Sequence, residues 1–146
     1  MSEVRIVRLD PSMPLPRYET AGAAGFDLAA AADVTIVPGQ VALIPTGLVI
    51  EVPAGHFLGV FARSSTPLKR GLIVANGVGV VDSDYCGPAD EIKVQVLNVT
   101  SQPVVVRRGD RLAQGVLLPF VRAQWREEPA TARPTRGGFG STDPTE

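Results

Sequence analysis

The chain of 146 residues lacks several features on which other classes of protein depend. It has a single cysteine, Cys86, so no internal disulfide can form. Its single histidine, His56, has no second His or Cys at metal-ligand spacing. No apolar run approaches about 18 residues and the N-terminus carries no signal-peptide pattern, so neither a membrane span nor secretion is expected. Together with the lone thiol, these absences predict a cytoplasmic protein.

Net charge and aromatic residues are also scarce. The formal net charge of −1 offers no electrostatic attraction to duplex nucleic acid or to an anionic membrane, so neither partner is expected. Only 5% of the residues are aromatic although 45% are hydrophobic, so the core must be built from Val, Leu, Ile and Ala. The 15 glycines and 13 prolines interrupt the chain too often for long helices. This composition predicts an all-β fold, a distorted β-barrel or jelly-roll-like sandwich of many short strands.

Apolar stretches between these interruptions give the expected strands, which cover residues 4–9, 34–37, 41–44, 47–52, 56–61, 78–81, 92–97, 103–106 and 112–120. Trp125 is expected to pack near the end of the core, so we predict one β-domain over residues 1–126. From Glu127 the composition changes to Glu, Pro, Thr, Arg and Gly, which predicts a flexible C-terminal arm over residues 127–146.

The segment 62–71 lacks the alternating pattern of a strand, and it predicts a short helix over residues 66–70. Thr66 is a candidate N-cap, and Gly71 is a candidate C-terminal stop. A guanidinium and two hydroxyls stand just before the helix, from Arg63, Ser64 and Ser65, where the helix N-terminus attracts anions. Capping alone would explain the hydroxyls but not the arginine, so this segment favours phosphate binding.

The stretch from residue 76 to residue 98 contains strand patterns on both sides of an acidic turn. After the turn, Ile92, Val94 and Val96 share one face, and Lys93, Gln95 and Leu97 share the other. The sequence therefore predicts a hairpin that carries Asp82–Tyr85 at its end. A plain acidic hairpin is the structural alternative, although a turn does not need two carboxylates and a phenol.

Three other features suggest a site. Two glycines precede Asp27, which predicts a close approach of the backbone there. Gln114 interrupts the apolar strand 112–120, and it either pairs in the core or faces a site. Phe139 stands among glycines in the arm, flanked by Arg and Ser/Thr, as in an arm that closes over a ring and phosphates. A disordered end is the alternative for that segment.

Together these segments resemble, in order, the five motifs of the trimeric all-β dUTPases, which hydrolyse dUTP to dUMP and pyrophosphate. The resemblance covers about residues 3–142, with motifs at 21–28, from Arg63 onward, and at 79–85, 108–114 and 137–142. Three departures matter. Ser65 stands where the family's second motif usually has Gly, and Thr66-Pro67 stands where it usually has a Leu-Ala-like pair. Pro88-Ala89-Asp90 is a three-residue insertion whose role the sequence leaves open. Pro134 stands where the family has its fifth-motif arginine, so either Arg133 or Arg136 could serve that motif.

The resemblance implies a role for each motif. Asp82 would deprotonate the water that attacks the α-phosphorus. Main-chain groups of residues 78–82 would pair with uracil, and Tyr85 would exclude a ribose 2′-hydroxyl. The implied nucleoside-binding residues are Asn76, Val80, Val81, Tyr85 and Lys93. The implied phosphate-binding residues are Arg63, Ser64, Ser65 and Gln114, joined from the arm by Arg136, Gly140, Ser141 and Thr142, with Phe139 on the uracil ring.

The resemblance also implies a cofactor and an assembly. Mg²⁺ would bind the triphosphate oxygens and waters without a direct protein ligand, and Asp27 could at most hold a metal-bound water. Three subunits would form a homotrimer and share each active site. Two rival functions remain open: a dCTP deaminase of the same fold, and a nucleotide-sensing or protein-binding module that has lost turnover. Release of pyrophosphate from dUTP would separate them.

Overall fold

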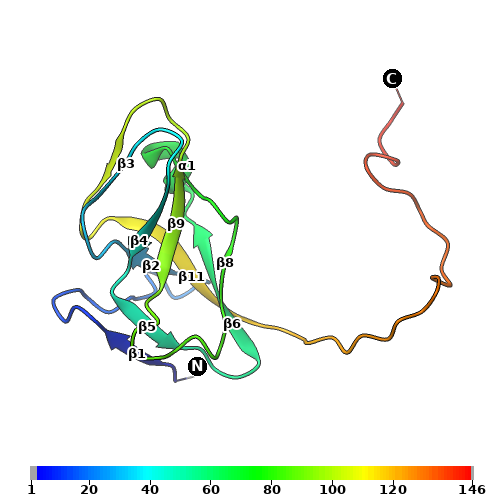
Figure 1. Cartoon of the computed structure of the whole chain (residues 1–146), viewed down its shortest axis with the longest axis horizontal. Coiled ribbons are helices and arrows are strands. Elements are labelled where there is room, and N and C mark those ends of the chain that lie inside the picture. The colour runs from blue at the N-terminus through cyan, green and yellow to red at the C-terminus, as the bar shows by residue number, and fades with distance from the viewer. Residues whose placement is uncertain (1–2, 146) are drawn as a thin grey trace.

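Eleven short strands and one short helix make up the protein in the computed structural model, which describes residues 3–145 (Figure 1). The all-β prediction is confirmed. The elements are β1 (Arg5–Arg8), β2 (Phe26–Ala29), β3 (Val34–Ile36), β4 (Val41–Pro45), β5 (Leu48–Glu51), β6 (His56–Ala62), α1 (Ser65–Arg70), β7 (Leu72–Val74), β8 (Gly79–Val81), β9 (Lys93–Asn98), β10 (Val104–Val106) and β11 (Arg111–Pro119).

The strands pair antiparallel in four small sheets. The largest has the order β2-β11-β6-β8, and the next has the order β4-β9-β7. Two-stranded pairs β1-β5 and β10-β3 complete the body. Over residues 3–145 these sheets do not close into one barrel, and the arrangement is jelly-roll-like. The strands β2 and β7 were not predicted from the sequence.

One apolar core lies between the sheets. Its buried cluster contains only Val, Leu, Ile and Ala side chains, as the low aromatic content required. The predicted alternation after the acidic turn is confirmed, because Ile92, Val94 and Val96 are buried whereas Lys93 is exposed. No helix within residues 3–145 combines the length and the apolar character needed to cross a bilayer.

The predicted hairpin around Asp82–Tyr85 is wrong. β8 pairs with β6, whereas β9 pairs with β4 and β7, so the acidic turn connects two different sheets. Alternation along a strand predicts which face is buried, but it does not predict which strand lies alongside.

The helix prediction is correct in place but wrong at its N-terminus. Helix α1 begins at Ser65, and its N-cap is Ser64, which makes no side-chain capping bond. Thr66 lies inside the helix and is buried. Its hydroxyl donates to the carbonyl of Leu112 at 2.8 Å and accepts from the N–H of Arg63 at 2.9 Å. The hydroxyl thus joins the helix to β11. Gly71 ends the helix at φ +66°, as predicted.

The packed body ends at Phe120. Its N–H donates to the carbonyl of Gly55 at 3.1 Å, and its ring centroid lies 6.4 Å from that of Phe57. Beyond it, every described residue is exposed, and the chain runs away from the body as an extended arm (Figure 1). The prediction that Trp125 packs against the core is wrong within one chain, because its side chain is 90% exposed.

Candidate active site

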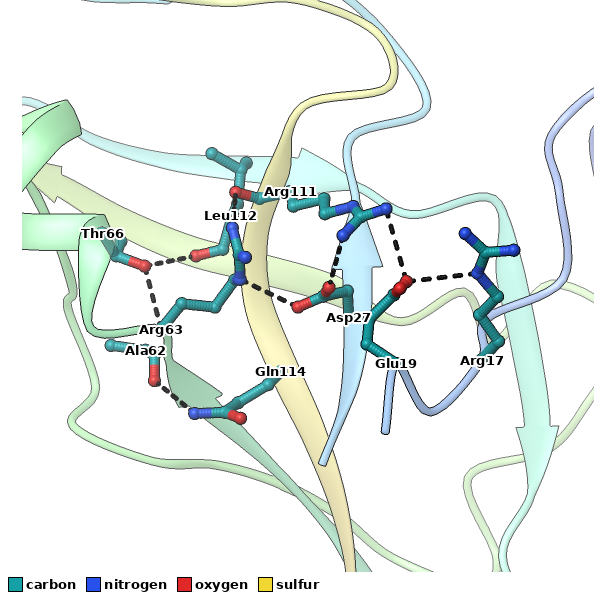
Figure 2. A network of polar contacts seen from close by, with 9 residues as sticks. All are labelled: Arg17, Glu19, Asp27, Ala62, Arg63, Thr66, Arg111, Leu112 and Gln114. Atoms are coloured by element: carbon teal, nitrogen blue, oxygen red, sulfur yellow. Dashed lines mark hydrogen bonds and ion pairs between the residues drawn. The ribbon is translucent and has the colours of Figure 1, made fainter. Parts of the chain in front are cut away.

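Asp27 on β2 lies between two guanidinium groups (Figure 2). Its Oδ1 is 2.8 Å from Nε of Arg63, and its Oδ2 is 3.1 Å from Nη1 of Arg111. The Asp27 side chain is 19% exposed and that of Arg63 is 29% exposed, so solvent screens this pair less than a surface pair. Asp27 therefore fixes the orientation of the arginine that sequence analysis assigned to phosphate.

The ion pairs continue away from Arg63. Nη2 of Arg111 lies 3.3 Å from Glu19, whose carboxylate also lies 3.2 Å from Nε of Arg17 (Figure 2). Nη1 of Arg63 donates to the carbonyl of Arg111 at 3.3 Å. Two of the three guanidinium nitrogens of Arg63 are thus engaged by Asp27 and by Arg111. Its Nη2 has no protein partner among residues 3–145 and can donate to an anion.

Gln114 on β11 lies beside this cluster. Its Nε2 donates to the carbonyl of Ala62 at 3.0 Å, at the residue before Arg63. The predicted close approach near Asp27 is confirmed at Gly25, where a Cβ would lie 2.8 Å from Oε1 of Gln114. Both alternatives for Gln114 hold in part, because the half-buried amide pairs with backbone and also borders the arginine cluster.

Helix α1 is held beside this arginine cluster by two polar contacts. The hydroxyl of Thr66 reaches β11, and Nη1 of Arg70 lies 3.0 Å from a carboxylate oxygen of Asp110. Ser64 is exposed and Ser65 is half-buried at the start of the helix, adjacent in sequence to Arg63. We call Arg63, Ser64, Ser65 and Gln114 the phosphate-side residues.

The turn before Arg111 is held by carboxylates from distant segments. Asp33 accepts the N–H of Arg108 at 2.7 Å, and Oδ2 of Asp10 lies 3.1 Å from Nη2 of Arg108. The hydroxyl of Ser12 donates to Asp10 at 2.5 Å. The Ser12 hydroxyl, followed by Arg108, lowers the pKa of Asp10 below its usual 3.8.

The residues assigned to the nucleoside lie elsewhere in the chain. Val80 on β8 is 61% exposed, Val81 is buried, and Asp82 is exposed directly after the strand. The N–H of Tyr85 donates to the carbonyl of Asp82 at 3.2 Å, and the Tyr85 hydroxyl donates to the carbonyl of Glu91 at 3.0 Å. Asn76, in the turn before β8, and Lys93, at the start of β9, are both exposed. We call Asn76, Val80, Val81, Asp82, Tyr85 and Lys93 the nucleoside-side residues.

One chain does not bring these two groups together. Val81 on β8 pairs with Leu58 on β6, and Arg63 follows Leu58 by five residues along β6. At about 3.4 Å per residue, Arg63 lies roughly 17 Å along the strand direction from the level of Val81. Asp82 follows Val81 on the side that points away from Arg63, because β8 is antiparallel to β6. Asp82 and Arg63 therefore lie at opposite ends of β6.

The arm contains its own tight turns. The N–H of Ser141 donates to the carbonyl of Gly138 at 3.2 Å, and the two central residues, Phe139 and Gly140, have φ of +53° and +82°. The N–H of Gly137 donates to the hydroxyl of Thr135 at 2.9 Å. A positive φ is rare for a residue with a side chain. The Phe139 ring is fully exposed at the tip of this turn. Arg136, Ser141 and Thr142 are exposed as well, and Figure 1 shows this arm away from the body.

Sequence analysis gave no role to Arg111, Glu19 or Glu91. The only available signal for Arg111 was its place in the charged turn before Gln114. Glu19 and Glu91 stand out only through the residues that they contact in the fold. Over residues 3–145 there is no cluster of three or more His, Cys, Asp or Glu side chains that could hold a metal ion.

Comparison with known proteins shows the family of this chain. The family model for dUTPase matches residues 12–143. The chain belongs to the dUTPase family. The deoxyuridine 5'-triphosphate nucleotidohydrolase of Desulfitobacterium hafniense is 52% identical over 96% of this chain and 94% of its own length. The protein is therefore a dUTPase, and its reaction is the hydrolysis of dUTP to dUMP.

Solved structures agree with this assignment. The crystal structure of the dUTPase from Streptococcus mutans is 38% identical, with a TM-score of 0.75, over 85% of this chain and 100% of that one. A mutant dUTPase from phage phi11 of S. aureus, described with a structural Mg(II) ion, is 19% identical, with a TM-score of 0.79. It covers 88% of this chain and 98% of its own, and at that identity it supports the fold alone.

Proposed function

We propose that this dUTPase works as a homotrimer in which each active site combines the nucleoside-side residues of one subunit with the phosphate-side residues of another. The observation that carries this proposal is the position of Asp82 and Arg63 at opposite ends of β6, six residues and so roughly 20 Å apart along the strand. An attacking water and the phosphorus that it attacks must lie about 3–3.5 Å apart. At their separation in one chain, Asp82 and Arg63 do not meet at the same phosphorus, whereas those of two chains related by rotation can.

Asp82 is the general base in this proposal. Its exposed carboxylate follows β8 directly, so the strand fixes its backbone while the side chain remains accessible to water. Asp82 orients one water, accepts its proton, and the oxygen attacks the α-phosphorus of dUTP. The P–O bond to the β-phosphate breaks, and dUMP and pyrophosphate leave.

Arg63 neutralises charge on the phosphates. Phosphoryl transfer depends on positioning and on charge stabilisation more than on covalent chemistry. Asp27 and the Arg111 carbonyl hold two of the guanidinium nitrogens, so the side chain is oriented before substrate arrives. Ser64, Ser65 and the Gln114 amide supply neutral hydrogen bonds beside that charge.

The nucleoside side selects uracil and deoxyribose. Main-chain groups around Val80 and Val81, with the Asn76 side chain and the region of Lys93, complement the acceptor–donor–acceptor edge of uracil. The Tyr85 ring lies against C2′ and leaves no volume for a ribose hydroxyl. Its hydroxyl bond to Glu91 supports this role, because it holds the far end of the ring in place.

Magnesium belongs to this proposal as a partner of the substrate. Mg²⁺ would be held by triphosphate oxygens and waters, because this hard ion prefers oxygen ligands and retains several of its waters. When bound there, it neutralises charge on the phosphate oxygens. Both oxygens of Asp27 are in ion pairs, but each keeps a lone pair that can accept from a metal-bound water.

The arm completes the site in this proposal. Residues 127–146 close over the bound nucleotide, with Phe139 on the uracil and with Arg136, Ser141 and Thr142 on the phosphates. The exposed ring at the tip of a tight turn supports this role, because the turn already presents the side chain that must stack. We also propose that the enzyme works in the cytoplasm, where the free thiol of Cys86 would stay reduced.

Release of pyrophosphate from dUTP by the Asp82→Asn variant tests the base. The amide keeps the shape of the carboxylate but cannot accept a proton from water, so turnover should fall by about 10²–10⁴-fold. Binding of dUTP should stay within roughly tenfold, because the amide affects the transition state more than the ground state. Asp84→Asn is the matched control and should keep most of the activity. Strong loss in Asp84→Asn with near-normal turnover in Asp82→Asn would move the base to Asp84.

A further inference from the structure

The three-residue insertion Pro88-Ala89-Asp90 closes on itself. A carboxylate oxygen of Asp90 accepts the N–H of Gly87 at 2.8 Å, and the N–H of Asp90 donates to the carbonyl of Gly87 at 3.0 Å. Two hydrogen bonds thus join the residue before the insertion to its last residue. A Cβ on Gly87 would lie 3.0 Å from the same carboxylate oxygen, so the contact is close. Asp90 therefore lies close to Gly87.

The residue after the insertion is anchored to the core. A carboxylate oxygen of Glu91 accepts the N–H of Gly47 at 2.8 Å. The N–H of Ile92 donates to the carbonyl of Leu48 at 2.8 Å, and the carbonyl of Ile92 accepts the hydroxyl of Thr46 at 2.5 Å. Ile92 and Thr46 are buried, so the carbonyl of Glu91 has a fixed position.

Tyr85 is attached to that anchored residue. Its hydroxyl donates to the carbonyl of Glu91 at 3.0 Å, and its N–H donates to the carbonyl of Asp82 at 3.2 Å. The ring is therefore held at its backbone and at its tip. The only chain between Tyr85 and the anchored Glu91 is Cys86, Gly87 and the insertion, so the closure of that segment affects where Tyr85 lies relative to Glu91.

We infer that Asp90 is a positioning residue that sets the selectivity of this enzyme for deoxyribose. Its carboxylate closes the turn at Gly87, the closed turn keeps the Tyr85 hydroxyl within reach of the anchored Glu91 carbonyl, and that bond holds the ring against the sugar. The inference rests on the proposed function, in which the Tyr85 ring excludes the ribose 2′-hydroxyl. In this inference the insertion contributes to substrate selectivity, in addition to connecting β8 to β9.

The test compares Asp90→Ala with Asp90→Asn. Alanine removes the acceptor for the Gly87 N–H, whereas the Asn side-chain oxygen can still accept it. We measure kcat/KM for dUTP and for UTP with pyrophosphate release as the readout. The ratio should fall roughly 2- to 10-fold in Asp90→Ala, which corresponds to the net contribution of one hydrogen bond. In Asp90→Asn it should stay within about twofold of the wild-type ratio, because the acceptor is retained.

A second pair of variants tests whether Asp90 acts through the tyrosine tip. Tyr85→Phe keeps the ring but removes the hydroxyl that reaches Glu91. Adding Asp90→Ala to Tyr85→Phe should therefore change the dUTP/UTP ratio little further, which a double-mutant cycle measures. A merely structural role would instead lower turnover of both nucleotides equally in either background.

The outcomes separate this inference from the proposed role of Tyr85. If Tyr85→Ala lowers the dUTP/UTP ratio and Asp90→Ala leaves it unchanged, the inference is overturned and the role of Tyr85 stands. If neither variant changes the ratio, sugar selection lies elsewhere and both are overturned. A lower ratio in Asp90→Ala, recovered in Asp90→Asn and absent in the Tyr85→Phe background, supports the inference.

Discussion

Two inactive variants should restore each other's activity when they are assembled into one oligomer. The variants are Asp82→Asn, which removes the proposed base, and Arg63→Ala, which removes the oriented guanidinium. In each homotrimer every site lacks one of these groups. If sites form between subunits, a mixed trimer contains one interface at which the intact Asp82 of one chain meets the intact Arg63 of the other.

The structure determines how much activity the mixed trimers should regain. Asp82 and Arg63 lie roughly 20 Å apart along β6 in one chain, so one chain does not bring both groups to a single phosphorus. In a cyclic trimer of two chain types, one of the three ordered interfaces has the required pairing, whichever type is in excess. Purified mixed trimers should therefore regain about one third of wild-type turnover. The Asp82→Asn parent should retain about 1% or less.

Co-expression of the two chains with different affinity tags, followed by purification on both, isolates the mixed trimers. Pyrophosphate release from dUTP measures their turnover, and light scattering measures their mass. Arg63→Ala combined with Gln114→Ala is the matched control. Both variants damage the phosphate side, so no interface in that mixture is intact and no recovery is expected. Mixed trimers as inactive as their Asp82→Asn and Arg63→Ala parents would refute the shared site.

Four further predictions concern the arm, the assembly and the fold. Truncation after Thr131 should lower kcat for dUTP more than it weakens binding of a non-hydrolysable analogue, because arm contacts tighten as charge shifts in the transition state; equal losses would contradict this. Arg136→Ala should lower kcat/KM more than Arg133→Ala in parallel assays, and the reverse order would assign the fifth-motif arginine to Arg133. Light scattering at micromolar concentration should give the mass of three chains, and a fully active monomer would contradict the assembly. Asp10→Asn should lower the urea midpoint at pH 7. That difference should shrink as pH falls below 3.8 and vanish below the lowered pKa of Asp10, because a group with a depressed folded-state pKa contributes stability that is lost as pH falls through that pKa. A difference that does not shrink as the pH falls below 3.8 would contradict this origin.

Local chemistry made much of this protein predictable from the sequence. Gly71 ends α1 because a left-handed φ there costs glycine little. Ile92, Val94 and Val96 face the core because side chains in a strand alternate, whichever strand lies alongside. The absence of aromatic side chains from the buried cluster follows from composition. The order of the motifs along the chain, which sequence alone determines, was sufficient to indicate the family and its reaction.

Contacts between distant segments were decided only by the tertiary structure. β8 pairs with β6 rather than with β9, and the alternation of side chains along a strand does not specify which strand lies alongside. Thr66 has the residue type and place of a helix cap, yet its hydroxyl binds the carbonyl of Leu112, which is 46 positions away. In the sequence, Asp27 is a single carboxylate in a Gly-rich stretch. Only the fold shows that it lies between Arg63 and Arg111. Sequence patterns predict the secondary structure of a segment and which of its side chains face the core, because neighbouring residues determine both. Pairing across a sheet depends on the whole chain, and it is pairing that separates Asp82 from Arg63.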